Sequence, residues 1–131
     1  METIACGPGI IERYLELGGD PVDEEGKPVD GAVIDKRAAA GDEAAIAAEA
    51  RSGHAIGEVL GSLSNMLDPE CIILSGSVAL CGPAWHDAMD AGWREAAMPP
   101  VAATPIVSGD LGGDAPLIGA AENIVKSAYA D

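Results

Sequence analysis

The longest helical pattern in the chain runs from Asp42 to Leu67 and restricts the possible folds more than any other feature. Asp42 is a favourable N-cap because its carboxylate can accept hydrogen bonds from the free amides of a first helical turn. Asp68-Pro69 ends the pattern, since the residue before a proline is disfavoured in helical conformation. A helix over this range would be roughly 39 Å long. We therefore expect it to be the central packing element.

Glycine recurs at every fourth position along this helix, at Gly53, Gly57 and Gly61. Each glycine costs about 1 kcal/mol relative to alanine inside a helix, so three of them need a structural reason. Close approach of another helix or of a sheet would supply it. A neighbouring stripe is apolar and consists of Ile56, Leu60, Leu63 and Leu67.

The segment after the helix predicts a buried strand. Residues 71–74 read "CIIL", and consecutive apolar residues are typical of a strand covered on both faces, as in parallel sheets. The remaining pattern predicts helices over 10–17, 32–40, 84–97 and 115–130, a strand over 104–108 and a glycine-rich turn over 110–114. Strands that alternate with helices predict an α/β fold with a right-handed crossover.

Length and composition indicate one domain and exclude several classes of protein. The chain has 131 residues, and the acidic segment 18–31 has the composition of a flexible, solvated loop. The net charge of −15 argues against a nucleic-acid partner, which would need clustered Lys and Arg. No apolar run is long enough to span a membrane, and the first residues do not resemble a signal peptide. Cytoplasmic location is therefore expected.

The turn after the first strand is a candidate ligand site. Ser75, Gly76 and Ser77 follow the carboxyl end of the strand, where ligands bind in open α/β sheets. Backbone amides in such a turn can receive a phosphate or an adenine edge. A turn with only a packing role explains the same residues.

Two further glycine-containing segments offer polar groups. In "GDLGGDA", Asp110 and Asp114 could hold a metal, although Asp114 is equally well explained as a helix N-cap. In "ACGPGIIERY", Glu12 could accept hydrogen bonds from a polyol or simply be a surface residue. The three cysteines form no CxxC pair and predict neither a disulfide framework nor a complete zinc site.

Four segments together resemble the carboxyl-terminal half of the ROK family of bacterial sugar kinases and sugar-responsive repressors. They read "CGPGIIERY", "AAAGDEAA", "LGSLSNMLDPECIILSGSV" and "LGGDAPLIGAAE". The resemblance implies the carboxyl-terminal lobe of an actin-like ATPase (ribonuclease H-like) fold, rich in helices and with a small, largely parallel sheet. It also implies ATP with Mg as cofactor, a sugar substrate and a homodimer.

The resemblance assigns roles to individual residues. Ser75, Gly76 and Ser77 match the family's nucleotide-binding turn, which usually contains consecutive glycines, and Glu12 matches the glutamate that holds sugar hydroxyls. Of the family's zinc motif "CGxxGCxE", Cys6 is the one cysteine present, and the upstream histidine is missing. The resemblance therefore does not extend to a zinc site.

The family's "DxGxT" phosphate loop and catalytic aspartate do not occur in the chain. We therefore interpret residues 1–131 as a single domain, the carboxyl-terminal lobe of a glucokinase-like kinase that is inactive without its amino-terminal lobe. Two alternatives are the sugar-sensing lobe of a ROK repressor and a remnant that only mediates dimerisation through the glycine-striped helix and the closing helix.

Overall fold

The computed structural model of the protein describes residues 2–128. The described α-helices are α1 (Glu2–Ala5), α2 (Gly7–Glu16), α3 (Gly31–Ala39), α4 (Glu43–Leu67), α5 (Pro83–Ala96) and α6 (Ala115–Ala128). Two strands, β1 (Ile72–Leu74) and β2 (Ile106–Ser108), and two short 3-10 helices, η1 (Val78–Leu80) and η2 (Gly112–Asp114), complete the described elements. The elements α1, η1 and η2 were not predicted from the sequence.

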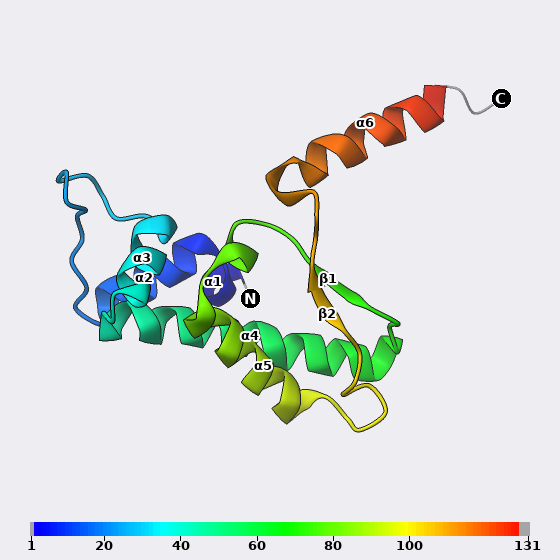
Figure 1. The fold of residues 1–131 in the computed structure, drawn as a ribbon, viewed down its shortest axis with the longest axis horizontal. Helices are drawn as coiled ribbons and strands as arrows, with labels where there is room; N and C mark the ends of the chain where they lie inside the picture. The colour runs from blue at the N-terminus through cyan, green and yellow to red at the C-terminus, as the bar shows by residue number, and fades with distance from the viewer. Residues whose placement is uncertain (1, 129–131) are drawn as a thin grey trace.

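Helix α4 forms the axis of the molecule, and α1, α2 and α3 gather around its amino-terminal half (Figure 1). Asp42 caps it by accepting a hydrogen bond of 3.0 Å from the amide of Ala45. At the other end Asp68 adopts the left-handed conformation, with φ of 46°, as the C-cap. Both predicted ends of the helix are confirmed.

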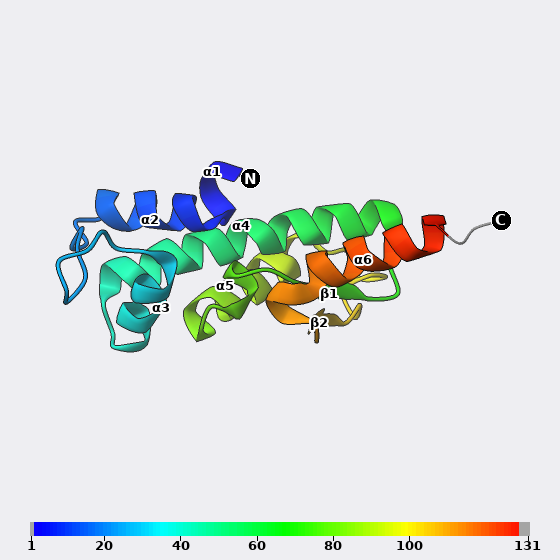
Figure 2. The ribbon, with the colours of Figure 1, turned by 90° about the horizontal axis from the view of Figure 1, so that it is seen from above.

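The glycines of α4 allow α5 to pack against it at very short range, as Figure 2 shows from above. A Cβ atom at Gly57 would overlap the carbonyl oxygen of Met89 and lie 2.6 Å from the amide nitrogen of Trp93. A Cβ at Gly53 would overlap the carbonyl oxygen of Trp85 in the same way. The glycine stripe is therefore covered by a helix of the same chain. This corrects the prediction that it forms part of a dimer surface.

The main core lies between α2, α3 and the first half of α4. Its buried side chains include Ile10, Tyr14 and Ile34, packed against Ala45 and Ala48. These two alanines let α2 and α3 approach α4 closely. The buried members of this core therefore combine the ring of Tyr14 with aliphatic side chains and alanines.

The acidic segment 18–31 forms a hairpin-like turn tied to α3. An antiparallel bridge joins Val22 to Pro28. The guanidinium of Arg37 donates to the backbone oxygens of Asp20 and Val22, at 2.9 Å and 2.5 Å, and to the Tyr14 hydroxyl at 2.8 Å. These contacts fix the base of the segment to the core. Its flexibility stays a prediction.

The two strands pair in parallel, with Ile72 opposite Ile106. Ile73 is 67% exposed, so the prediction of a strand covered on both faces is wrong within the described residues. Helix α6 leaves the end of β2 and projects away from α4 and α5 (Figure 1). Leu63 and Leu67 of the apolar stripe on α4 are also exposed, at 47% and 71%, because α5 packs on the glycines instead.

Among the described helices, none combines the length and the apolar composition that a membrane-spanning helix needs.

Candidate functional site

The turn formed by Ser75, Gly76 and Ser77 lies at the carboxyl end of β1, and all three residues are exposed. Gly76 has a backbone φ of +108°, a conformation that residues other than glycine rarely adopt. A Cβ atom built on Gly76 would meet nothing within 4 Å. Glycine is therefore required here by the backbone, and the space in front of the turn is open.

A second glycine-containing turn follows β2 at the same edge of the sheet. The amide of Gly109 donates a hydrogen bond of 2.8 Å to the carbonyl of Leu74, so the carboxyl ends of both strands are held together. Gly112 adopts a positive φ of +51° further along this turn. Asp114 is the last residue of η2, directly before α6. Within residues 2–128, neither Asp110 nor Asp114 belongs to a group of three potential metal ligands.

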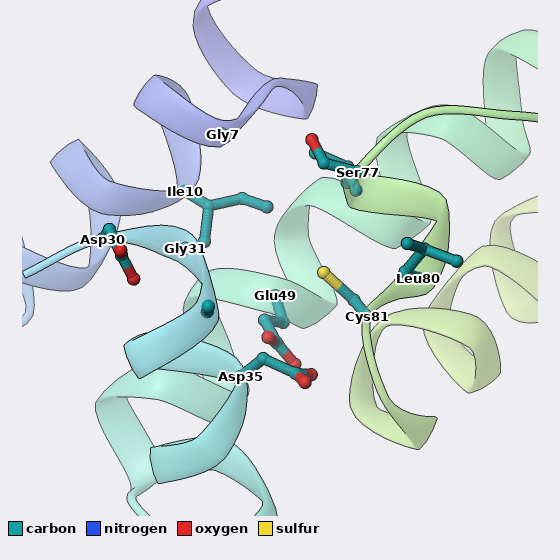
Figure 3. A pocket seen from close by; sticks show the side chains of 11 residues that line it. Gly7, Ile10, Asp30, Gly31, Asp35, Glu49, Ser77, Leu80 and Cys81 are labelled. Atoms are coloured by element: carbon teal, nitrogen blue, oxygen red, sulfur yellow. The ribbon is translucent and has the colours of Figure 1, made fainter. Parts of the chain in front are cut away.

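A pocket of about 430 Å³ lies beside this edge, between α2, α3, α4 and the segment from Ser77 to Cys81 (Figure 3). Its lining residues are Gly7, Ile10, Asp30, Gly31, Ala32, Asp35, Glu49, Ser77, Val78, Leu80 and Cys81. The nucleotide turn predicted from the sequence therefore borders the pocket through Ser77.

The floor of the pocket holds two carboxylates and a thiol. One ligand atom from each of Asp35, Glu49 and Cys81 lies within 4.8 Å of the other two. Figure 3 shows the two carboxylates pointing toward each other, with the sulfur on the same side of the pocket. Asp35 accepts a hydrogen bond of 2.7 Å from the amide of Gly82, whereas neither carboxylate oxygen of Glu49 has a hydrogen-bond partner.

Burial and mutual repulsion disturb the ionisation of these groups. Glu49 is 1% exposed, and its pKa is raised to about 7, first by burial, then by the negative charge of Asp35, and last by a hydrogen bond that Glu49 would donate to Asp35 once it is protonated. Burial, with smaller effects of Glu49 and Asp35, raises the pKa of Cys81 to about 11. In the absence of a cation, Glu49 and Cys81 therefore keep their protons to a higher pH than the same groups would on an exposed surface.

The cluster of Asp35, Glu49 and Cys81 was not predicted from the sequence, although the position of Glu49 on α4 could have indicated that its carboxylate is buried. Glu49 lies four residues before Gly53, so it occupies the same face of α4 as the small residues that α5 and α3 cover. A single charged residue on an otherwise small and buried stripe is unusual. Asp35 and Cys81 carry no comparable local pattern.

Glu12, the predicted sugar ligand, is exposed on α2 and lines a different pocket of about 260 Å³, near Arg13 and Arg51. The structure does not bring it into the pocket that Ser77 borders. Cys6 is the half-buried N-cap residue of α2, and its side chain makes no capping hydrogen bond. In the described part of the chain, Cys6 is not a member of either group of three clustered metal ligands.

Three solved structures share this architecture. A ROK hexokinase from Thermus thermophilus is 25% identical with a TM-score of 0.72, over 91% of this chain and 38% of that one. A putative sugar kinase from Cytophaga hutchinsonii is 26% identical with a TM-score of 0.75, over 91% and 42%. A ROK family glucokinase from Streptomyces griseus, in complex with glucose and AMPPNP, is 22% identical with a TM-score of 0.74, over 92% and 43%.

The last of these likenesses concerns the fold alone, and the chain spans 38–43% of the length of the three proteins. The predicted fold class is confirmed, since these are kinases of the actin-like ATPase fold and the chain is rich in helices with a small parallel sheet. No curated protein sequence matches the chain. The sequence profile of the ROK family matches residues 1–127, and the chain therefore belongs to the ROK family.

Proposed function

We propose that the chain is the nucleotide-side lobe of an ATP-dependent sugar kinase of the ROK type, with Ser75, Gly76 and Ser77 in contact with the nucleotide. The observation that carries the proposal is the exposed turn at the carboxyl ends of two parallel strands. A side chain at Gly76 would stand in the open space in front of this turn. Because Gly76 has no side chain, a ligand can approach the backbone amides of the turn.

The chemistry of phosphoryl transfer divides between two lobes in this proposal. The turn binds the adenosine side of ATP, and the other lobe supplies the Mg-phosphate contacts and the base that the reaction requires. The ROK family glucokinase of similar fold was crystallised with glucose and AMPPNP, which supports a sugar and a nucleotide as ligands here as well. Activity is then expected from the complete kinase and not from residues 1–131.

Exposed apolar side chains support the existence of a second lobe. None of the described residues of α6 is buried. Its Leu117 and Ile124 side chains are 72% and 70% exposed. Ile73 of β1 is exposed as well. A surface of this kind is stabilised when another lobe or chain covers it. In the predicted homodimer, α6 would form the contact that covers this apolar surface, and the glycine stripe of α4 would take no part in it.

Nucleotide titration followed by amide NMR tests the proposed turn. Adding ATP with Mg²⁺ should shift the amide signals of residues 75–77 and of Gly109, and Gly76→Val should abolish these shifts. Gly26→Val is a matched control, because Gly26 also has positive φ, +77°, and open space around its Cβ position. Equal nucleotide binding by both variants would refute the proposed role of Gly76.

The sugar contact is tested on Glu12 in the complete kinase. Glu12→Gln removes the charge that would hold sugar hydroxyls, so the Kd for sugar should rise at least tenfold while the Kd for nucleotide is unchanged. Glu24→Gln is the control, since Glu24 is exposed, belongs to the acidic hairpin and does not line this pocket. A parallel loss of both affinities would indicate misfolding and contradict the assignment.

The remaining expectations are tested by simple observations. A "DxGxT" loop encoded upstream supports the kinase, and a basic helix-turn-helix segment there supports the repressor. Cytoplasmic location and the homodimer stay predictions, which cell fractionation and analytical ultracentrifugation test directly.

A further inference from the structure

We propose that Asp35, Glu49 and Cys81 bind a divalent cation of the zinc class on the floor of the 430 Å³ pocket. This site is separate from the family's "CGxxGCxE" motif and does not depend on the proposed kinase activity. Its three residues come from α3, α4 and the segment that enters α5. A bound ion would therefore join three elements that are far apart in the sequence.

Glu49 is a buried carboxylate that lacks a hydrogen-bond donor. Its side chain is 1% exposed, and both carboxylate oxygens are buried without a hydrogen-bond donor. A buried carboxylate without a partner is costly, and proteins normally supply a cation or several donors. The ligand atoms of Asp35 and Cys81, which lie within 4.8 Å of that of Glu49, belong to another carboxylate and a thiol. A cation is the partner that this arrangement lacks.

The ligand atoms of the three residues lie close enough together to share one ion. All three lie within 4.8 Å of one another, and Figure 3 shows the carboxylates of Asp35 and Glu49 side by side in the pocket that Cys81 also lines. Zinc bonds of about 2.0–2.3 Å require ligand atoms somewhat closer than this, which small side-chain rotations provide. The amide of Gly82 donates a hydrogen bond of 2.7 Å to Asp35 and orients its carboxylate, as hydrogen-bond donors commonly do for a carboxylate that binds a metal. One coordination position would face the open pocket.

The chemistry of the three ligands favours one class of ion. Calcium and magnesium prefer shells made entirely of oxygen, whereas a cysteine sulfur favours zinc and similar metals. With two carboxylates and one thiolate, zinc fits the donor set better than either hard cation. The net charge of −15 also favours accumulation of cations at the protein surface.

Cobalt(II), which replaces zinc and absorbs light when bound to a thiolate, is the probe for this site. Chelator-treated chain is titrated with Co²⁺, and the expected result is a thiolate-to-cobalt charge-transfer band that saturates at one equivalent and disappears on adding Zn²⁺. Cys81→Ser should abolish the band. Cys71→Ser is the control and should retain it, because Cys71 is exposed and lies before β1, outside the pocket.

Affinity and thermal stability provide the second readout. Glu49→Gln should weaken Co²⁺ binding by at least about 10- to 100-fold. That is the usual effect of removing a residue that only hydrogen-bonds to a metal ligand, and Glu49 would bind the ion itself. Zn²⁺ should raise the Tm of the unaltered chain and of Cys71→Ser, and leave that of Cys81→Ser unchanged. His54→Ala tests the exposed group of His54, Glu58 and Glu95, and it should not alter the band.

Three results would overturn the proposal. They are the absence of a charge-transfer band in the folded, unaltered chain, a band that persists in Cys81→Ser, and a Tm that Zn²⁺ raises equally in both cysteine variants. The first would mean that a proton shared by Asp35 and Glu49, rather than a metal, neutralises the cluster. If Glu49→Gln does not fold, as judged by circular dichroism, the comparison of Cys81→Ser with Cys71→Ser decides the matter alone.

Discussion

Replacing Gly57 by alanine adds a single methyl group at the closest point between α4 and α5. The new Cβ would overlap the carbonyl oxygen of Met89 and lie 2.6 Å from the amide of Trp93. Both are backbone atoms, which cannot rotate away as a side chain can. The two helices would therefore have to move apart to accept the methyl group.

The expected cost follows from that separation. Moving the helices apart by about 1 Å forfeits up to half of the dispersion energy of each contact between them. Overpacking of this kind typically costs about 1–3 kcal/mol, and contact with backbone places Gly57→Ala at the upper end. Alanine returns about 1 kcal/mol through its higher helix propensity. We expect a net loss of about 2 kcal/mol in the free energy of unfolding.

Urea denaturation followed by tryptophan fluorescence measures this loss directly. The chain has two tryptophans, Trp85 and Trp93, and both are buried residues of α5. Gly31→Ala is the control, because Gly31 is the first residue of α3 and its Cβ would meet nothing within 4 Å. The control should change stability by less than about 0.5 kcal/mol. A Gly57→Ala chain as stable as the unaltered one would refute the close packing of α4 and α5.

Two further changes test the buried polar groups. Because the pKa of Glu49 is raised to about 7 beside Asp35, the metal-free protein should lose about 3 kcal/mol of stability as pH rises from 4.5 to 8. Glu49→Gln should remove this loss. If urea denaturation gives the same dependence of the free energy of unfolding on pH for Glu49→Gln and for the unaltered protein, the prediction is contradicted. Ser52→Ala deprives the buried Trp85 indole N–H of its acceptor at 3.0 Å and should cost about 1–3 kcal/mol in thermal unfolding. The exposed Ser62→Ala should cost almost nothing, and equal effects would disprove the role of this hydrogen bond.

The local elements followed from the sequence because their signals are local. A capping aspartate and an Asp-Pro pair define the ends of α4, and the glycine spacing predicted a close helix neighbour. Helix α5 was predicted over 84–97 and is found at Pro83–Ala96. Helix α2 begins at Gly7, earlier than predicted, because Pro8 suits its first turn. The turn at Gly76 also followed from its position after an apolar strand, whereas its exposure is a finding of the structure.

The sequence by itself determined the five longer helices and the two strands, although not α1, η1 or η2, since periodicity, caps and glycine spacing act over a few residues. It also determined the family, whose pattern extends over nearly the whole chain. Only the tertiary structure decided that Asp35, Glu49 and Cys81 share one pocket and that Glu12 lines another. The reason is physical. Which side chains meet across different helices depends on how closely those helices pack. The contact between α4 and α5 is set by backbone atoms, and the residues next to Asp35 or Cys81 in the sequence carry no pattern that predicts it.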